Sequence, residues 1–256
     1  MSGEEEVIYG VNPVLESLRS EEKGLNKIYL LPKRGGKEID EIRLLARRRR
    51  VTLLTAERDA LDRMARTAKH QGVVGFVSAQ RYREVEELLA VSKRRNEPAF
   101  LFILDEVEDP RNLGAIIRTS DAAGAHGMII PERRSAGLTA VVSKTSAGAL
   151  AHFPVARVVN ISSTLDRLKR ENIWIVGVET GAKVSYLEYD FTEPVAVLIG
   201  GEGKGIHRKI LEKCDQVVSL PMRGHVSSLN VSVAAGIVAY EILRQRANKF
   251  KSKGAS

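Results

Sequence analysis

Near-continuous apolar runs recur through the second half of the chain. They read AFLFILDEV (99–107), HGMIIP (126–131), IWIVGVE (173–179) and VAVLIGG (195–201), and segments with helical spacing separate them. Runs that are apolar at nearly every position are typical of strands buried on both faces. Strands that alternate with helices predict an α/β fold, a parallel sheet covered by helices on both faces, over roughly residues 99–246.

The first eighty residues predict a smaller α/β unit. Asn12 and Pro13, a capping residue followed by a first-turn proline, are expected to start its first helix. A strand, a helix and two more strands are then predicted at LNKIYLL (25–31), KEIDEIRLLARRRR (37–50), VTLL (51–54) and GVVGFVS (72–78). These elements predict a compact open sandwich over residues 1–80.

Two further segments differ in composition from these units. Residues 81–98 are highly charged and carry a helical apolar stripe (Val85, Leu88 and Leu89), which predicts a charged linker helix ending between Asn96 and Pro98. Residues 247–256 are basic and rich in small residues, so we expect a flexible tail there.

The charge balance favours polyanionic partners. Lys and Arg number 40 against 32 Asp and Glu, which gives the 256-residue chain a formal charge of +8. Nucleic acid is the first expectation, and a generally basic cytosolic enzyme is the alternative. Aromatic residues make up only 5%, which argues against an extended base-stacking platform. The arginine run 47–50 fits either an RNA contact or a solvated helix end.

Several classes of protein are disfavoured. The lone cysteine, Cys214, is expected to pack at a helix end, and a single cysteine fits a reducing cytoplasm. The acidic start, Glu4 to Glu6, argues against a secretory signal, and no stretch approaches the length needed to span a bilayer. We therefore expect a cytoplasmic protein without a membrane segment, and the scattered histidines predict no metal site.

Candidate chemistry gathers in three segments, each of which follows a predicted strand. In residues 216–237, Pro221 ends a strand, Gly224 lies in a loop, and Ser227 or Ser228 is expected to cap an apolar helix near Asn230. Exposed backbone donors beside hydroxyls and a carboxamide suit a polar ligand. An ordinary capped helix is the competing interpretation.

The second segment, residues 105–125, places a turn at Asp109-Pro110 and Asn112 near the start of a helix that carries Arg118. An arginine within an otherwise small, apolar helix needs a partner. That partner is either a ligand or a neighbouring carboxylate, Asp109 or Asp121.

The third segment, VLIGGEGKGI (197–206), is a glycine-rich turn. It fails the P-loop pattern because Gly205, not Ser or Thr, follows Lys204, and its glycines are wrongly spaced for a dinucleotide fingerprint. A turn that allows close backbone approach to a ligand, with Glu202 at its centre, remains.

Together the three segments resemble the SpoU-type (TrmH-like) RNA 2′-O-ribose methyltransferases of the SPOUT superfamily. The matching motifs are DxxxDPxNxGxxxR at 105–118, IGGEGxG at 199–205 and LPMxGxxxSLNVSVAAGI at 220–237. The front end, from YGVNPVLESL to HQGVVGFVS, resembles the ribosomal-protein-like RNA substrate-binding domain of the family. The combination is most similar to family members that methylate guanosine in 23S rRNA.

The resemblance implies a deep C-terminal trefoil knot, a homodimer, and S-adenosyl-L-methionine as cofactor, with RNA rather than DNA as substrate. It also implies cofactor contacts from three segments of this chain: Gly200, Leu220, Leu229, Glu179, Thr180, Gly181, Ile199, Gly201 and Met222. Glu179-Thr180 departs from the Gly-Thr often found at that place in the family.

The resemblance further implies that Arg118 activates the ribose hydroxyl, helped by Asn112, Glu202, Ser228 and Asn230. Arginine normally has a pKa above about 12. Either burial lowers that pKa, or the cation stabilises the developing alkoxide. A tRNA substrate, or a non-catalytic RNA-binding factor that keeps the fold, are the alternatives.

Overall fold

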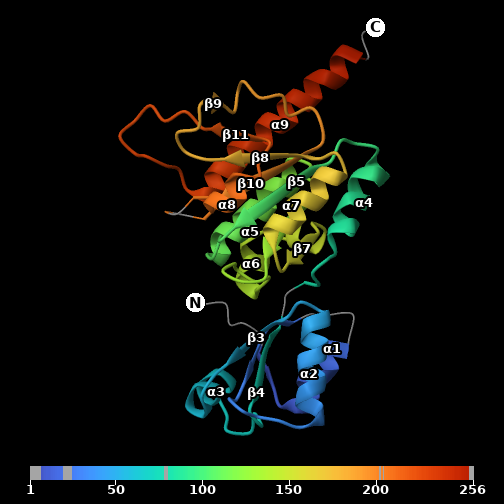
Figure 1. Cartoon of the computed structure of the whole chain (residues 1–256), viewed down its shortest axis with the longest axis vertical. Helices are drawn as coiled ribbons and strands as arrows, with labels where there is room; N and C mark the ends of the chain where they lie inside the picture. Colours follow the sequence, from blue (N-terminus) through green and yellow to red (C-terminus); the bar gives the residue numbers. More distant parts are fainter. Residues whose placement is uncertain (1–6, 20–24, 78–79, 202, 204, 254–256) are drawn as a thin grey trace.

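A computed structural model of the protein describes residues 7–19, 25–77, 80–201, 203 and 205–253, and these residues build two sheets (Figure 1). The N-terminal unit contains β1 (Val7–Tyr9), α1 (Val11–Arg19), β2 (Leu25–Leu30), α2 (Lys37–Arg48), β3 (Thr52–Thr55), α3 (Arg58–Ala65) and β4 (Val73–Val77). Its strand order is β1-β4-β2-β3, with β4 antiparallel to both neighbours. Helices α1 and α2 pack on one face and α3 on the other, so both faces are covered.

The C-terminal unit contains α4 (Val85–Arg95), β5 (Phe100–Asp105), α5 (Pro110–Ala122), β6 (Gly127–Pro131), α6 (Ala140–Thr145), a 3₁₀ turn (Ala149–Ala151), β7 (Val155–Val158), α7 (Ile161–Arg170), β8 (Trp174–Val178), β9 (Val184–Ser185), β10 (Val195–Gly200), α8 (Arg208–Leu211), β11 (Gln216–Ser219) and α9 (Val231–Lys253). Its strand order is β7-β6-β5-β10-β8-β11-β9, and all neighbouring strands are parallel. The predicted parallel sheet is therefore confirmed.

Helices cover both faces of this sheet. On one face α5, α6 and α9 bury Leu113, Ile117, Val142 and Val238 against the strands. On the other face α4 and α7 bury Leu88 and Leu165, with α8 at the edge of the same cluster. Each central strand therefore meets helices on both sides, which explains why β5, buried at all six positions, is a continuous apolar run.

Three local predictions need correction or refinement. Helix α1 begins at Val11, so Asn12 lies inside the first turn instead of capping it, although Pro13 keeps a first-turn place. The charged segment 81–98 contains the predicted helix, which ends at Asn96 in the left-handed conformation, but its apolar stripe packs Val85 and Leu88 against the sheet of the C-terminal unit. The predicted flexible tail is wrong for 247–253, which continue α9.

The two units are joined by a buried arginine. Arg157 on β7 is 5% exposed, and its Nη1 donates to the Asn26 carbonyl at 2.9 Å. Its guanidinium lies 4.4 Å from the centre of the Tyr82 ring, whose hydroxyl hydrogen-bonds Asn26 Oδ1 at 2.7 Å. Arg50, from the arginine run, pairs with Glu84 at 2.8 Å and so supports this junction. Arg47 and Arg48 are exposed.

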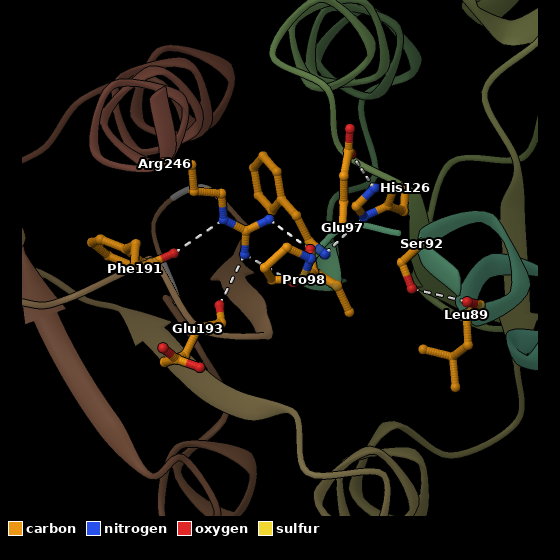
Figure 2. Close-up of polar contacts among 10 residues, drawn as sticks. Leu89, Ser92, Glu97, Pro98, His126, Phe191, Glu193 and Arg246 are labelled. Atoms are coloured by element: carbon orange, nitrogen blue, oxygen red, sulfur yellow. Dashed lines mark hydrogen bonds and ion pairs between the residues drawn. The ribbon is translucent and has the colours of Figure 1, made fainter. Parts of the chain in front are cut away.

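The C-terminal half of α9 is held by a half-buried arginine, Arg246 (Figure 2). Arg246 donates to four backbone carbonyls, of Phe191 at 3.2 Å, Pro98 at 2.7 Å, Ala99 at 3.0 Å and Glu193 at 2.9 Å. Burial lowers the pKa of its guanidinium to about 10. These bonds anchor the C-terminal helix to the start of β5 and to the segment before β10, which explains why the chain stays helical past residue 246.

Figure 2 also shows a buried histidine beside this anchor. His126 Nδ1 accepts a hydrogen bond from the Phe100 N–H at 3.0 Å, so Nε2 carries the proton and donates to Glu97 at 2.9 Å. Burial lowers the pKa of His126.

No helix in the described part of the chain is long and apolar enough to cross a membrane.

Candidate active site

A cavity of about 630 Å³ lies at the carboxyl ends of β8, β10 and β11. In open α/β sheets, ligands bind beyond the carboxyl ends of the strands where the strand order changes direction. Here β5 is followed by β6 and β7 on one side, whereas β8 to β11 lie on the other. The cavity is lined by Val178, Glu179, Thr180, Ile199, Gly200, Gly201, Gly203, Gly205, Leu220, Met222, Ser227, Ser228, Leu229, Asn230, Val231 and Ala234.

A second cavity of about 250 Å³ adjoins the first. It lies between the start of α5 and the start of α9, and it shares Gly201 and Val231 with the larger cavity. Its other lining residues are Glu106, Val107, Glu108, Asp109 and Asn112. A ligand in the first cavity would therefore lie next to a second group placed against Asn112.

The glycine-rich turn owes its shape to close backbone approach. A Cβ atom at Gly200 would lie 2.1 Å from the carbonyl carbon of Gly205, so no side chain fits there. Gly205 itself has a φ of +65°, in the left-handed region that favours glycine. A Cβ at Gly205 would also lie 2.6 Å from a carboxylate oxygen of Glu179. The turn therefore lines the cavity with backbone groups.

Asn230, not a serine, caps α9. Its Oδ1 accepts a hydrogen bond from the Ser232 N–H at 2.9 Å, and its carbonyl accepts from Val233 at 3.0 Å. The prediction that Ser227 or Ser228 caps the helix is therefore wrong, because the helix begins two or three residues later than expected, at Val231. Both serines lie instead in the wall of the larger cavity.

The starts of α5 and α9 meet through two asparagines. Asp109 caps α5 by accepting the Arg111 N–H at 2.7 Å, and Pro110 occupies the first turn. This places Asn112 in the first turn of the helix, where its Oδ1 accepts from Asn230 Nδ2 at 3.1 Å. The predicted partners Asn112 and Asn230 are thus brought together across the boundary between the two cavities.

The remaining predicted residues divide as follows. The larger cavity is lined by eight of the residues expected to contact the cofactor and by two expected to orient the ribose: Glu179, Thr180, Ile199, Gly200, Gly201, Leu220, Met222 and Leu229, with Ser228 and Asn230. Gly181 and Arg118, both in the described part of the chain, are not among the lining residues of either cavity. Arg118 is exposed on α5. Glu202 lies outside the described residues.

Sequence reasoning missed part of the lining. Val231 and Ala234 line the larger cavity from the first turn of α9, and Glu106 and Glu108 line the smaller one. The small residues of VSVAAGI were the available indication, because a helix start packed close to a ligand needs short side chains.

Two other kinds of chemistry outside the cavities would need a reactive thiol or a metal site. Burial raises the pKa of the Cys214 thiol to about 11, which leaves almost none of the reactive thiolate near neutral pH. Within the described residues there is no group of three or more His, Cys, Asp or Glu side chains placed to hold a metal ion.

Family models match both units of the chain. The SpoU rRNA Methylase family matches residues 99–240, and the RNA 2′-O ribose methyltransferase substrate-binding family matches residues 7–83. A Bacillus subtilis protein, YacO, whose name places it among TrmH family tRNA/rRNA methyltransferases, is 44% identical over 246 residues, which are 96% of this chain and 98% of that protein.

Solved structures are similar along most of the chain. The SpoU methyltransferase AviRb from Streptomyces viridochromogenes, in complex with S-adenosylmethionine, is 27% identical with a TM-score of 0.61, covering 95% of this chain and 91% of its own. An S-adenosylmethionine-bound rRNA methyltransferase from Sinorhizobium meliloti is 26% identical with a TM-score of 0.56, covering 93% and 86%. The TrmH/SpoU tRNA modifying enzyme of A. aeolicus is 29% identical with a TM-score of 0.54, covering 63% and 85%.

Proposed function

The chain belongs to the SpoU rRNA Methylase family, and from this premise we propose that it transfers a methyl group from S-adenosyl-L-methionine to a ribose 2′-hydroxyl in RNA. The single observation that carries the proposal is the pair of adjoining cavities bridged by the Asn230–Asn112 hydrogen bond. One cavity suits a cofactor and the other the reacting nucleoside.

The residues of the larger cavity fit the proposed cofactor. A volume of about 630 Å³ is within the usual range of roughly 300–1,000 Å³ for such sites. Leu220, Met222 and Leu229 offer apolar contact for an adenine ring, and the glycine-rich turn offers backbone donors and acceptors for the polar groups of the molecule. When bound, the cofactor supplies an electrophilic methyl group on a sulfonium.

The protein residues would then orient the ribose and receive its proton. Because the Asn230 side chain donates to Asn112 at 3.1 Å, both carboxamides are held in place, Asn230 in the wall of the larger cavity and Asn112 in that of the smaller one, where they can orient a bound ribose. Ser228 in the cavity wall offers a further hydrogen bond. A ribose hydroxyl is a poor nucleophile without a base. We still predict that Arg118 activates the ribose hydroxyl and that Glu202 helps to orient Arg118 and the ribose.

A homodimer would complete this arrangement. α9 presents exposed apolar side chains, Val233, Tyr240 and Leu243, beside α5, and Arg118 is exposed on α5. A second subunit packed on these two helices would bury the apolar side chains and remove water from Arg118.

We also propose that the chain end forms the trefoil knot. The strand order supports it, since β11 lies between β8 and β9, and α9 then returns to α5.

We propose rRNA as the substrate, with a guanosine of 23S rRNA as the target, as in the RlmB methyltransferase. The similarity of the Sinorhizobium meliloti rRNA enzyme over 93% of this chain supports rRNA. The tRNA modifying enzyme is similar over only 63%. The name of the Bacillus subtilis relative includes both tRNA and rRNA, so tRNA is the second candidate substrate. We expect the protein to act in the cytoplasm, where both RNAs lie.

Equilibrium dialysis with radiolabelled S-adenosylmethionine tests the class of function. We expect saturable binding at one cofactor per chain, and loss of binding when Gly200 is replaced by a larger residue. A protein that binds RNA but takes up no labelled cofactor would instead be a non-catalytic RNA-binding factor.

A further inference from the structure

The glycine-rich turn after β10 folds back on itself and is held at both ends by backbone bonds. The Gly201 N–H donates to the Asp105 carbonyl at 2.7 Å, and the Gly205 N–H donates to the Gly201 carbonyl at 3.2 Å. The next two amides, of Ile206 and His207, follow the sharp reversal at Gly205 and need partners of their own.

Two carboxylates supply those partners. Glu179 Oε2 accepts the Ile206 N–H at 2.9 Å, and Asp105 Oδ2 accepts the His207 N–H at 2.9 Å. The ring nitrogen Nδ1 of His207 lies 3.2 Å from the same Asp105 oxygen. Consecutive amides of one turn are thus bound by carboxylates from two different strands.

The sheet topology explains the pairing. Strand β10 lies between β5 and β8, and Gly200 pairs in register with Asp105. On the other side Ile199 pairs with Val178, the residue before Glu179. Each neighbouring strand therefore ends level with the turn and delivers one carboxylate to it.

Asp105 is only 3% exposed, and its cost of burial is offset by these bonds. A buried ionised carboxylate needs hydrogen-bond donors, and the His207 amide and ring supply them. Glu179 is half-buried and lines the larger cavity. Bonds from an amide to an ionised acceptor are shorter and about twice as strong as neutral ones.

We propose that Asp105 and Glu179 are positioning residues: together they form a carboxylate clamp that holds residues 200–201 and 205–207, the two ends of the glycine-rich turn, in the shape that binds the cofactor. The proposal rests on the proposed function. In it Glu179 binds the Ile206 N–H of the protein itself, in place of the direct cofactor contact that the sequence predicted. Neither carboxylate takes part in the chemical step.

The test compares Glu179→Ala, Glu179→Gln and Asp105→Ala with the intact protein. Two quantities are measured: the dissociation constant of labelled S-adenosylmethionine, and amide hydrogen exchange at Ile206 and His207. Loss of a charge-assisted bond should raise the dissociation constant by about tenfold to a hundredfold in the two alanine variants. Glu179→Gln keeps an acceptor oxygen, so it should restore most of the affinity.

Hydrogen exchange distinguishes the clamp from a direct contact. We expect exchange to accelerate at Ile206 in Glu179→Ala and at His207 in Asp105→Ala. Glu188→Ala is the matched control, because Glu188 also accepts a backbone N–H, from Ser185 at 3.1 Å, but does not line the cavity. It should leave cofactor affinity unchanged.

The outcomes separate the clamp from the proposed function. No binding of cofactor by the intact protein would overturn the function itself. Normal affinity in Glu179→Ala, or weakened affinity with unchanged exchange at Ile206, would overturn the clamp alone, the latter by making Glu179 a direct ligand. If Asp105→Ala does not fold, the Glu179 variants decide the question.

Discussion

Replacing Arg246 with methionine should strongly destabilise the C-terminal unit. Methionine keeps an apolar side chain of similar length against Phe100 but removes every hydrogen-bond donor. The carbonyls of Pro98, Phe191 and Glu193 would lose their Arg246 bonds, whereas the Ala99 carbonyl keeps the Val195 N–H at 2.8 Å. The change thus tests the anchor of α9 without removing its packing.

The magnitude follows from two opposing effects. Hydrogen bonds to a charged group contribute about 1.5–3 kcal/mol each, and Arg246 makes four of them. Against this, burial lowers the pKa of its guanidinium to about 10, which corresponds to a cost of about 3 kcal/mol for holding the charge at this site, at about 1.36 kcal/mol per pKa unit. Water can reach part of the vacated site, so we expect a net loss of roughly 3–5 kcal/mol in the free energy of unfolding.

Urea unfolding followed by tryptophan fluorescence measures this loss. The single tryptophan, Trp174, begins β8, so its signal reports on the C-terminal sheet rather than on the N-terminal unit. Arg244→Met is the control on the same helix. The exposed guanidinium of Arg244 bonds the Glu241 carboxylate and not the backbone carbonyls that Arg246 holds, so this change should cost clearly less stability than Arg246→Met. A loss below about 1 kcal/mol for Arg246→Met would refute the anchoring role.

Three further predictions address the cavity, pH and the thiol. Gly200→Ala should abolish cofactor binding in the dialysis assay, because its Cβ would lie 2.1 Å from Gly205; unchanged affinity would refute the described turn. The pKa of buried His126 is lowered, so the unfolded state binds more protons and stability should fall as pH drops below about 6.5, a slope that thermal melts of His126→Gln should lack. With its pKa raised from 9.0 to about 11, Cys214 should carry about 100-fold less thiolate at pH 8 than a free cysteine, partly offset by the higher nucleophilicity of a more basic thiolate. It should react with a disulfide reagent roughly tenfold more slowly, and an equal rate would contradict the shielding of the thiol.

The central strands could be predicted from the sequence, and the edge elements could not. β5, β6, β8 and β10 are apolar at nearly every position because helices cover both of their faces. β7 is buried too, but Arg157 interrupts its apolar pattern because that side chain serves the junction between the units. β9 has only two residues, too few to carry any periodicity.

In the candidate site, too, features set by nearby residues could be predicted from the sequence, and features set by residues distant in the sequence could not. Motif positions placed most of the cavity lining correctly, since the lining is largely backbone and small side chains. The helix cap was misplaced because Ser227, Ser228 and Asn230 have similar local preference for capping. What favours Asn230 is Asn112, which lies 118 residues away in sequence and holds its carboxamide.

The carboxylate clamp was hidden in the sequence for a related reason. Asp105 and Glu179 each follow an apolar run, which predicts only that they stand at strand ends. Their partners, the amides of Ile206 and His207, are set by the strand order, with β10 between β5 and β8. Strand order depends on contacts between distant segments, and no local pattern encodes it.

Mapping of 2′-O-methylated nucleotides tests the central claim most directly. Total rRNA and tRNA would be compared from cells with the gene, without it, and with an Asn230→Ala copy. We predict that one guanosine of 23S rRNA loses its 2′-O-methyl group without the gene, and that the Asn230→Ala copy does not restore it. Identical methylation patterns in rRNA and tRNA with and without the protein would contradict the account.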